Sequence, residues 1–405
     1  MGVGRFVYTP ILPLMHARAG LSAGSGAHLA TANYLGYLVG ALTGILAPAL
    51  VRSPALLRAS LIALTGSLAA MPVTHGTAAW ITLRLLAGIA SALVFVIAVS
   101  SLHSRLRAHP AHLSGWAFGG VGAGIALSGL LVLVLRPVAD WRAAWWASAA
   151  LAAILTAAAW KMRPEQPPAT AAAPGRAQAG KATAGNAESG KAAAGRPGPG
   201  ERSRFGLLLA SYSLEGIGYI VAGTFLVAAI EQSCPGWIGS GAWVLVGLAA
   251  VPSSALWARL GRRWSLPGLL LVALVVQAAG IALPALVGAV PAALVSAVLF
   301  GATFIGVSTL ALAAGSHLGF PRSVALLTAG YSVGQILGPL IVSPLLRQGY
   351  HQALFMAAAV VLAAAAAAAV LRIGFPDRGM VVRRGASAGQ PTAVGAATAR
   401  AGGDV

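Results

Sequence analysis

The sequence predicts an all-α integral membrane protein with twelve transmembrane helices. Of its 405 residues, 58% are hydrophobic and 9% are charged, and the mean hydropathy is +0.82, which lies far outside soluble usage. Apolar runs recur along the chain at about 20 residues, the length that crosses a bilayer as a helix. They lack the strict two-residue alternation of outer-membrane strands, so a helical bundle is favoured over a barrel.

The predicted spans are separated by short polar or Gly/Pro-containing connections. The first is the opening stretch "MGVGRFVYTPILPLM", which ends at a polar break from His16 to Arg18. Five more are expected near residues 28–50, 56–74, 79–101, 113–135 and 142–160. The last six are expected near residues 205–230, 238–258, 266–288, 291–313, 323–346 and 350–371.

The composition changes abruptly between the sixth and seventh spans. Residues 161–203 form an Ala/Gly/Pro/Lys tract without apolar periodicity, which predicts a disordered cytoplasmic linker. The expected domains are therefore an N-terminal six-helix bundle (1–160), the linker (161–203), a C-terminal six-helix bundle (204–372) and a disordered tail (373–405).

The two sets of six spans carry an internal repeat at nearly one offset. The matching segments are GWAFGGVGAG and GYSVGQILGP (215 residues apart), LLAGIASALVF and VLFGATFIGVS (213), and GVGRFVYTP and GIGYIVAGT (214). Agreement among three offsets indicates two pseudo-symmetric halves.

Comparison of the two repeats indicates why the opening stretch is shorter than a membrane span. The second copy has "RFGLLLASYSLE" ahead of its GIG, whereas the first copy has only Met1. We therefore expect the first span to be truncated by about eleven residues in this sequence, through a misassigned start or a truncation. The alternative is a genuinely short or re-entrant first helix.

The formal charge of +19 indicates orientation and contact with anionic lipid rather than nucleic-acid binding. Without the long linker and the tail, eight arginines fall on connections of one face and four on the other: Arg52, Arg58, Arg105, Arg107, Arg259, Arg262, Arg263 and Arg322 against Arg18, Arg136, Arg142 and Arg347. The positive-inside rule then predicts an inner or plasma membrane protein with both termini in the cytoplasm. Glu231, near the outer end of the seventh span, is expected to reach water.

Two six-helix halves joined by a long cytoplasmic loop resemble the major facilitator superfamily. The segments "GVGRFVYTPILPLM", "ATANYLGYLVGAL", "RLLAGIASALVFV", "SLEGIGYIVAGTFL" and "LTAGYSVGQILGPL" resemble its YbfB/YjiJ-like branch over essentially all of the membrane part. This resemblance implies the major facilitator fold, alternating access, and a central cavity lined by spans 1, 4, 7 and 10.

Three ionisable residues lie well within predicted spans: Arg5, Arg84 and Glu215. A charge near the bilayer centre costs about 2.5 to 3.5 kcal/mol, so structure or function must use it. Arg84 begins "RLLAG", which resembles the superfamily's Arg-x-x-x-Gly element, and its spacing puts Gly88 on the same helix face. Arg84 is expected to hold an anionic substrate group or to act on a nearby carboxylate; the alternative is a structural arginine bonded to helix carbonyls.

Glu215 is the candidate proton-coupling residue, with Tyr219 one turn later. A carboxyl group in the cavity wall can bind and release a proton as the cavity opens to either side. The alternative is a structural salt bridge with Arg5 or Arg84. The candidate substrate-binding residues are Arg5, Arg84, Tyr8, Asn33, Tyr37, Tyr219 and Gln335. Pro10 and Pro13 are expected to bend the first span.

The predicted function is secondary active transport of a small organic solute, coupled to protons. Two buried arginines against one glutamate favour an anionic or polar neutral solute. No catalytic, metal-ligating or cofactor motif is found, and a single cysteine, Cys234, excludes an internal disulfide. The alternatives are an uncoupled facilitator of the same fold and, from another class, a membrane-embedded sensor or scaffold. The expected partners are the solute, protons and lipid, with no nucleic acid, and the expected state is a monomer.

Overall fold

A computed structural model describes the chain except residues 48–49, 51, 107–111, 139, 163–197 and 376–405. Every regular element that it describes is a helix, which confirms the predicted fold class. In chain order the elements are α1 (Gly2–Phe6), α2 (Tyr8–Arg18), α3 (Ala23–Leu46), α5 (Pro54–Ala70), α6 (Thr77–Leu106), α7 (His112–Leu135), α8 (Trp141–Ala159), α10 (Pro199–Ser233), α11 (Ile238–Leu260), α12 (Leu266–Leu286), α13 (Val290–Leu318), α14 (Ser323–Val342), η1 (Leu345–Arg347) and α15 (Tyr350–Ile373).

Nine of the described helices are long and apolar enough to cross a membrane: α6, α7, α8, α10, α11, α12, α13, α14 and α15. A tenth, α5, is apolar but has 17 residues. Each predicted span after the first corresponds to one helix, with ends that differ by several residues. The largest extension is at α10, which begins at Pro199, where Glu201 Oε2 accepts a hydrogen bond from the Gly198 backbone N–H (3.3 Å).

The first predicted span is divided into two helices by a single residue, Val7, which keeps helical dihedral angles (φ −66°, ψ −21°) and donates its N–H to the Val3 carbonyl oxygen (3.0 Å). α1 ends at Phe6 and α2 begins at Tyr8, so the break falls before both prolines. Pro10 has no N–H to donate to the carbonyl of Phe6, four residues earlier, so the regular bonding pattern is interrupted at this point. The break lies directly beside Arg5.

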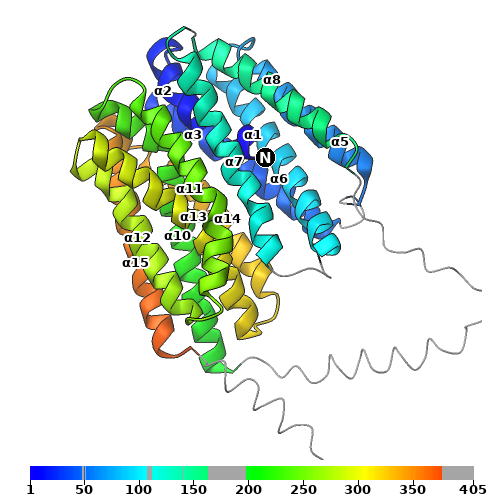
Figure 1. The fold of residues 1–405 in the computed structure, drawn as a ribbon, viewed down its shortest axis with the longest axis vertical. Coiled ribbons are helices and arrows are strands. Elements are labelled where there is room, and N and C mark those ends of the chain that lie inside the picture. Colours follow the sequence, from blue (N-terminus) through cyan, green and yellow to red (C-terminus); the bar gives the residue numbers. More distant parts are fainter. Residues whose placement is uncertain (48–49, 51, 107–111, 139, 163–197, 376–405) are drawn as a thin grey trace, which may run out of the picture.

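The helices pack as two groups, which we call the N-half (α1 to α8) and the C-half (α10 to α15). The N-half is blue to green-cyan and the C-half green to orange in Figure 1. Within the halves, α3 packs on α6, α5 on α8, and α10 on α14 and α15. Between them, α7 packs on α11 and α3 on α14.

The α7–α11 seam is built from glycines that allow the two backbones to touch. A Cβ added at Gly247 would lie 2.1 Å from the backbone nitrogen of Ala126, and one at Gly122 would lie 2.6 Å from that of Val251. Real Cβ atoms do not approach this closely, so these positions require glycine for the close approach of the helices.

We expect Gly247→Val to destabilise the protein by roughly 1 to 3 kcal/mol, because the added side chain must push α7 away from α11. The measurement is thermal unfolding of the full chain in detergent. Gly66→Val in α5 is the matched control, because a Cβ at Gly66 meets nothing within 4 Å. Equal unfolding temperatures for the two variants would contradict the close packing of the seam.

The N-terminus lies beside α6 and α7, between the two ends of the bundle (Figure 1). A Cβ at Gly2 would lie 2.7 Å from the Cα of Gly124, which is in the middle of α7. Most of the predicted linker and tail fall outside the described residues, so those domain boundaries stay predictions.

Candidate functional site

Arg5 lies where the two halves meet and is 6% exposed. Its Nη2 donates a hydrogen bond to Oε1 of Gln335 on α14. Its guanidinium carbon lies 4.3 Å from the ring centroid of Tyr37 and 5.2 Å from that of Tyr34, both on α3. The structure therefore brings Arg5, Tyr37 and Gln335 together from three helices, as a single cluster.

Arg84 on α6 joins this cluster and is 2% exposed. Its Nη2 donates to the carbonyl oxygen of Arg5 (3.3 Å), and its guanidinium carbon lies 4.8 Å from the Tyr8 ring centroid. Asn33 Nδ2 donates to the carbonyl oxygen of Arg84 (2.9 Å). A Cβ at Gly88, one turn along α6, would lie 2.1 Å from the carbonyl oxygen of Asn33, so glycine allows α3 to approach here.

A row of aromatic rings from the C-half forms the opposite side of the cluster. Tyr219 on α10 is stacked on Phe304 of α13, with centroids 5.4 Å apart and planes 5° apart. It is also stacked on Tyr331 of α14, at 5.7 Å and 13°. Phe6, next to Arg5, meets Phe304 edge-on at 6.4 Å, which joins the row to the N-half.

Glu215 is not part of this cluster. Its Oε1 accepts a hydrogen bond from Nε2 of Gln277 on α12 (3.2 Å), inside the C-half, and its side chain is fully buried. Oε2 has no hydrogen-bond partner among the described residues. The salt bridge with Arg5 or Arg84 that the sequence left open is not formed in this conformation, since both guanidinium groups bond to neutral oxygens.

Two hydrogen bonds seal the halves together one turn beyond Arg5, toward the end where α2 finishes and α3 begins. We call this the outer end, because the charge distribution predicts that it faces outward. Thr9 Oγ1 donates to the carbonyl oxygen of Gly223 (2.6 Å), and Tyr34 shares a hydrogen bond with Thr224 (2.8 Å). The half-buried members of the cluster, Tyr37 and Tyr331, lie on the other side of Arg5.

Glu231, expected to reach water, is partly exposed and is held in an ion pair. Its side chain is 10% exposed and forms a two-pronged ion pair with Arg136, which follows α7 at the outer end. The Arg136 Nη2 to Glu231 Oε2 distance is 2.9 Å. Packing of α11 against α10 at Gly239, where a Cβ would lie 2.6 Å from Glu231 Cγ, covers this carboxylate. The pair adds a contact between the halves at the outer end, where the His16 and Tyr350 rings also meet edge-on at 6.4 Å.

The comparisons with known proteins agree with this architecture. Residues 1–370 match the family model described as "Uncharacterised MFS-type transporter YbfB". The chain belongs to this family. The resemblance found in the sequence segments is thereby confirmed, and this YbfB-type chain is a multi-pass membrane protein of the major facilitator superfamily (MFS).

Two solved structures share the MFS fold with this YbfB-type protein. A mutant of the nucleoside transporter NupG gives a TM-score of 0.67, with 14% identity over 91% of this chain and 97% of that one. The other NupG structure gives 0.64, with 14% identity over 91% and 96%. At this identity the likeness concerns the fold. No curated protein matches the sequence.

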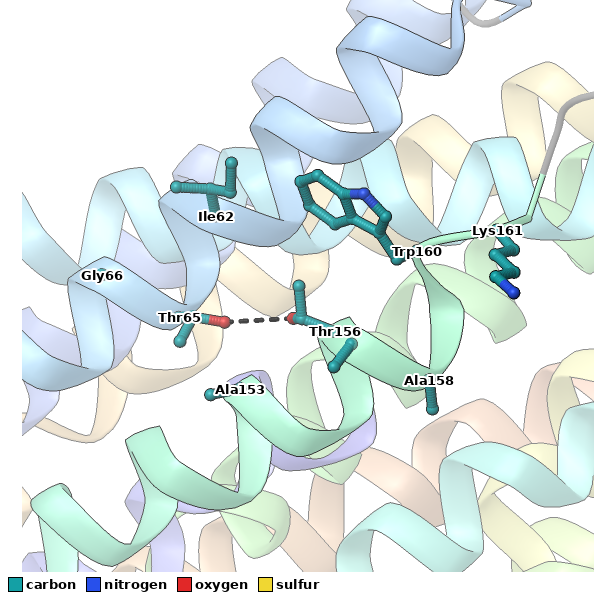
Figure 2. Close-up of a pocket in the computed structure, with 9 residues that line it drawn as sticks. Ile62, Thr65, Gly66, Ala153, Thr156, Ala158, Trp160 and Lys161 are labelled. Carbon is teal, nitrogen blue, oxygen red and sulfur yellow. Dashed lines mark hydrogen bonds between the residues drawn. The ribbon is translucent and has the colours of Figure 1, made fainter.

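A large cavity of this YbfB-type protein lies away from the Arg5 cluster. It has a volume of about 840 Å³ and is lined by α5 and α8, with a hydrogen bond of 3.2 Å between Thr65 and Thr156 across it (Figure 2). Its lining includes Ile62, Gly66 and Ala153. The one charged residue in the lining is Lys161, which follows the C-terminal end of α8 by two residues. These residues are on the outside of the N-half and provide no buried polar group for a solute, so we place the site at the Arg5 cluster.

Sequence reasoning missed Phe304 and the outer contacts. A signal for Phe304 exists, because Phe300 and Phe304 are four residues apart and therefore share a face of α13. The Arg136–Glu231 pair joins residues 95 positions apart in different halves, and nothing in either segment indicates the other.

Proposed function

We propose that this MFS protein is a secondary active transporter that moves a small organic solute by alternating access, coupled to protons, in the inner or plasma membrane with both termini in the cytoplasm. The observation that carries this proposal is the Arg5 cluster, which lies between the halves and contains buried donors from both arginines without partners. Rocking of two halves about such a cluster exposes it to either side in turn.

The solute is expected to be anionic or polar neutral. Two buried guanidinium groups favour an anion. The polar neutral class has its own support, because the two NupG structures with the same fold are those of a nucleoside transporter, and a nucleoside is polar and uncharged. The protein is proposed to act as a monomer and without a cofactor, and the alternative within the class is an uncoupled facilitator.

Glu215 is the proposed proton site. A fully buried carboxylate without a cationic partner is costly, so in this conformation the neutral acid is favoured. Release of its proton requires water or a cation to reach it, which the described conformation does not provide. Such a group links proton binding to the arrangement of α10 and α12.

The test uses purified full-length protein in proteoliposomes with an imposed pH gradient. Solutes from three classes are offered: organic acids, polar neutral compounds and nucleosides. We expect at least one class to cause proton movement that depends on the solute and on the protein. Counterflow of a solute without any proton movement would support the facilitator, and neither counterflow nor proton movement for every class would contradict transport.

The ion pair at the outer end leads to a second expectation. Glu231→Gln should favour opening of that end, because Arg136 loses its charged partner. A cysteine placed at Thr9 in a Cys234→Ser background should then react at least about three times faster with a membrane-impermeant thiol reagent added from outside, for a pair worth roughly 1 kcal/mol.

Glu201→Gln is the control for this measurement, because Glu201 lies at the opposite end of α10 in its first turn. Equal reaction rates in the Glu231 and Glu201 variants would show that the ion pair does not hold the outer end closed.

A further inference from the structure

The positive charges of Arg5 and Arg84 have no anionic partner among the residues that the structure describes. The ion pair recorded there is Arg136–Glu231, at the outer end. Arg5 Nε, Arg84 Nε and Arg84 Nη1 are buried and have no hydrogen-bond partner in the described part. The Nη2 atoms reach only neutral oxygens, those of Gln335 and of the Arg5 backbone. The cluster therefore lacks an anion.

The surroundings of the guanidinium groups limit how an anion can bind. The Arg5 guanidinium carbon lies over the Tyr37 ring and that of Arg84 over the Tyr8 ring. The donors without partners lie in the guanidinium planes, at their edges. A carboxylate is flat and accepts hydrogen bonds from a guanidinium edge, often two at a time. It could replace the amide oxygen of Gln335 at Arg5 without disturbing the stacked tyrosines.

The other side of the cluster is aromatic. Arg5 and Tyr219 occupy equivalent positions in the two repeats, 214 residues apart. Phe6, next to Arg5, meets Phe304 edge-on at 6.4 Å, and Tyr219 is stacked on the same Phe304 ring. Behind Tyr219 the rings of Phe304 and Tyr331 are almost parallel to it. A solute between the halves thus meets cations on one side and a row of flat rings on the other.

We propose that the solute of this site is an aromatic carboxylate, with its carboxyl group on Arg5 and Arg84 and its ring against Tyr219 and Phe304. This inference rests on the proposed transport function. An inorganic anion would satisfy the arginines and leave the rings unused. A nucleoside would stack on the rings and leave two buried cations without a counter-charge, and an aliphatic acid would gain no ring stacking.

Three matched probes separate these classes: phenylacetate, phenylacetamide, which lacks the charge, and cyclohexylacetate, which lacks the aromatic ring. Binding to the full-length protein in lipid nanodiscs is measured by titration calorimetry. We expect phenylacetate to bind at least about tenfold more tightly than phenylacetamide, through the charged hydrogen bonds. It should bind about three- to tenfold more tightly than cyclohexylacetate, through ring stacking.

Two variants assign these preferences to the site. Arg84→Gln should bring phenylacetate close to the affinity of phenylacetamide. Phe304→Leu should bring it close to that of cyclohexylacetate, whose own affinity changes little. Arg58→Gln and Phe225→Leu are the controls: Arg58 stacks on Trp160 at 5.3 Å on the outside of the N-half, and Phe225 packs near Tyr350 at 5.9 Å. Both controls should keep the preferences of the wild type.

Equal affinities for the three probes, or preferences that survive both site variants, would overturn the proposal. The proteoliposome test keeps this outcome apart from failure of the transport function. Transport of a nucleoside or an aliphatic acid without binding of phenylacetate would overturn the aromatic carboxylate alone. Binding of phenylacetate with the expected preferences, but without transport of any solute, would overturn the transport function and leave the binding site standing.

Discussion

Replacing Arg84 by glutamine is expected to lower solute transport about thirty- to a hundredfold without lowering the stability of the protein. A hydrogen bond to a charged group contributes about 1.5 to 3 kcal/mol, and Arg84 has two buried donors without a partner among the described residues. This loss is expected whether the transported solute is an anion or a polar neutral compound, because both would accept hydrogen bonds from Arg84. The measurement is the initial rate of solute counterflow in proteoliposomes.

The stability part of this expectation is what separates a binding residue from a structural one. Removing a partner from a satisfied buried pair is destabilising, whereas Arg84 is a buried cation without an anionic partner among the described residues, so its removal relieves a cost. The unfolding temperature of Arg84→Gln should equal or exceed that of the wild type. Arg58→Gln, which removes another arginine stacked on an aromatic ring, should transport normally. A marked drop in unfolding temperature for Arg84→Gln would favour the structural alternative.

Replacing Glu215 by glutamine is expected to abolish accumulation of solute driven by a pH gradient and to leave counterflow intact. Glutamine keeps a hydrogen-bonding oxygen for Gln277 Nε2 and the size of the side chain, but cannot release a proton. A proton moving through 100 mV supplies about 2.3 kcal/mol, which corresponds to about a fiftyfold solute gradient that the variant would lose.

The measurement compares accumulation with and without the gradient, in the wild type and in the variant. Glu201→Gln is the control, because Glu201 is on the same helix but exposed at its first turn. Accumulation that persists in Glu215→Gln would show that a residue other than Glu215 couples transport to protons. Wild-type protein that does not respond to the gradient would favour the facilitator.

The fold could be predicted from the sequence because it follows from span length and from the repeat. Apolar runs of bilayer length gave one helix for each span after the first, and the three repeat offsets agree with the arrangement of two halves. The interruption at Val7 precedes both prolines, because Pro10 removes the hydrogen bond to the carbonyl of Phe6, one turn earlier.

The candidate site could be predicted only in part. Burial of Arg5, Arg84 and Glu215 follows from their depth in apolar spans. Which face each presents depends on helix rotation, which the sequence does not fix. Glu215 and Tyr219 are one turn apart on α10, yet Tyr219 reaches α13 and α14 whereas Glu215 reaches Gln277 on α12. A small difference in the direction of these two side chains from α10 places Tyr219 at the interface of the halves and Glu215 inside the C-half.

Three polar contacts on the outer side of Arg5 carry a consequence for direction. Two neutral hydrogen bonds and one partly exposed ion pair together are worth roughly 1 to 4 kcal/mol. If they alone set the resting equilibrium, the conformer accessible from that side would be about 5 to 1,000 times rarer than the sealed one. A solute that arrives there would show an apparent affinity weakened by the same factor. The resting protein would accordingly be biased to load from the opposite side.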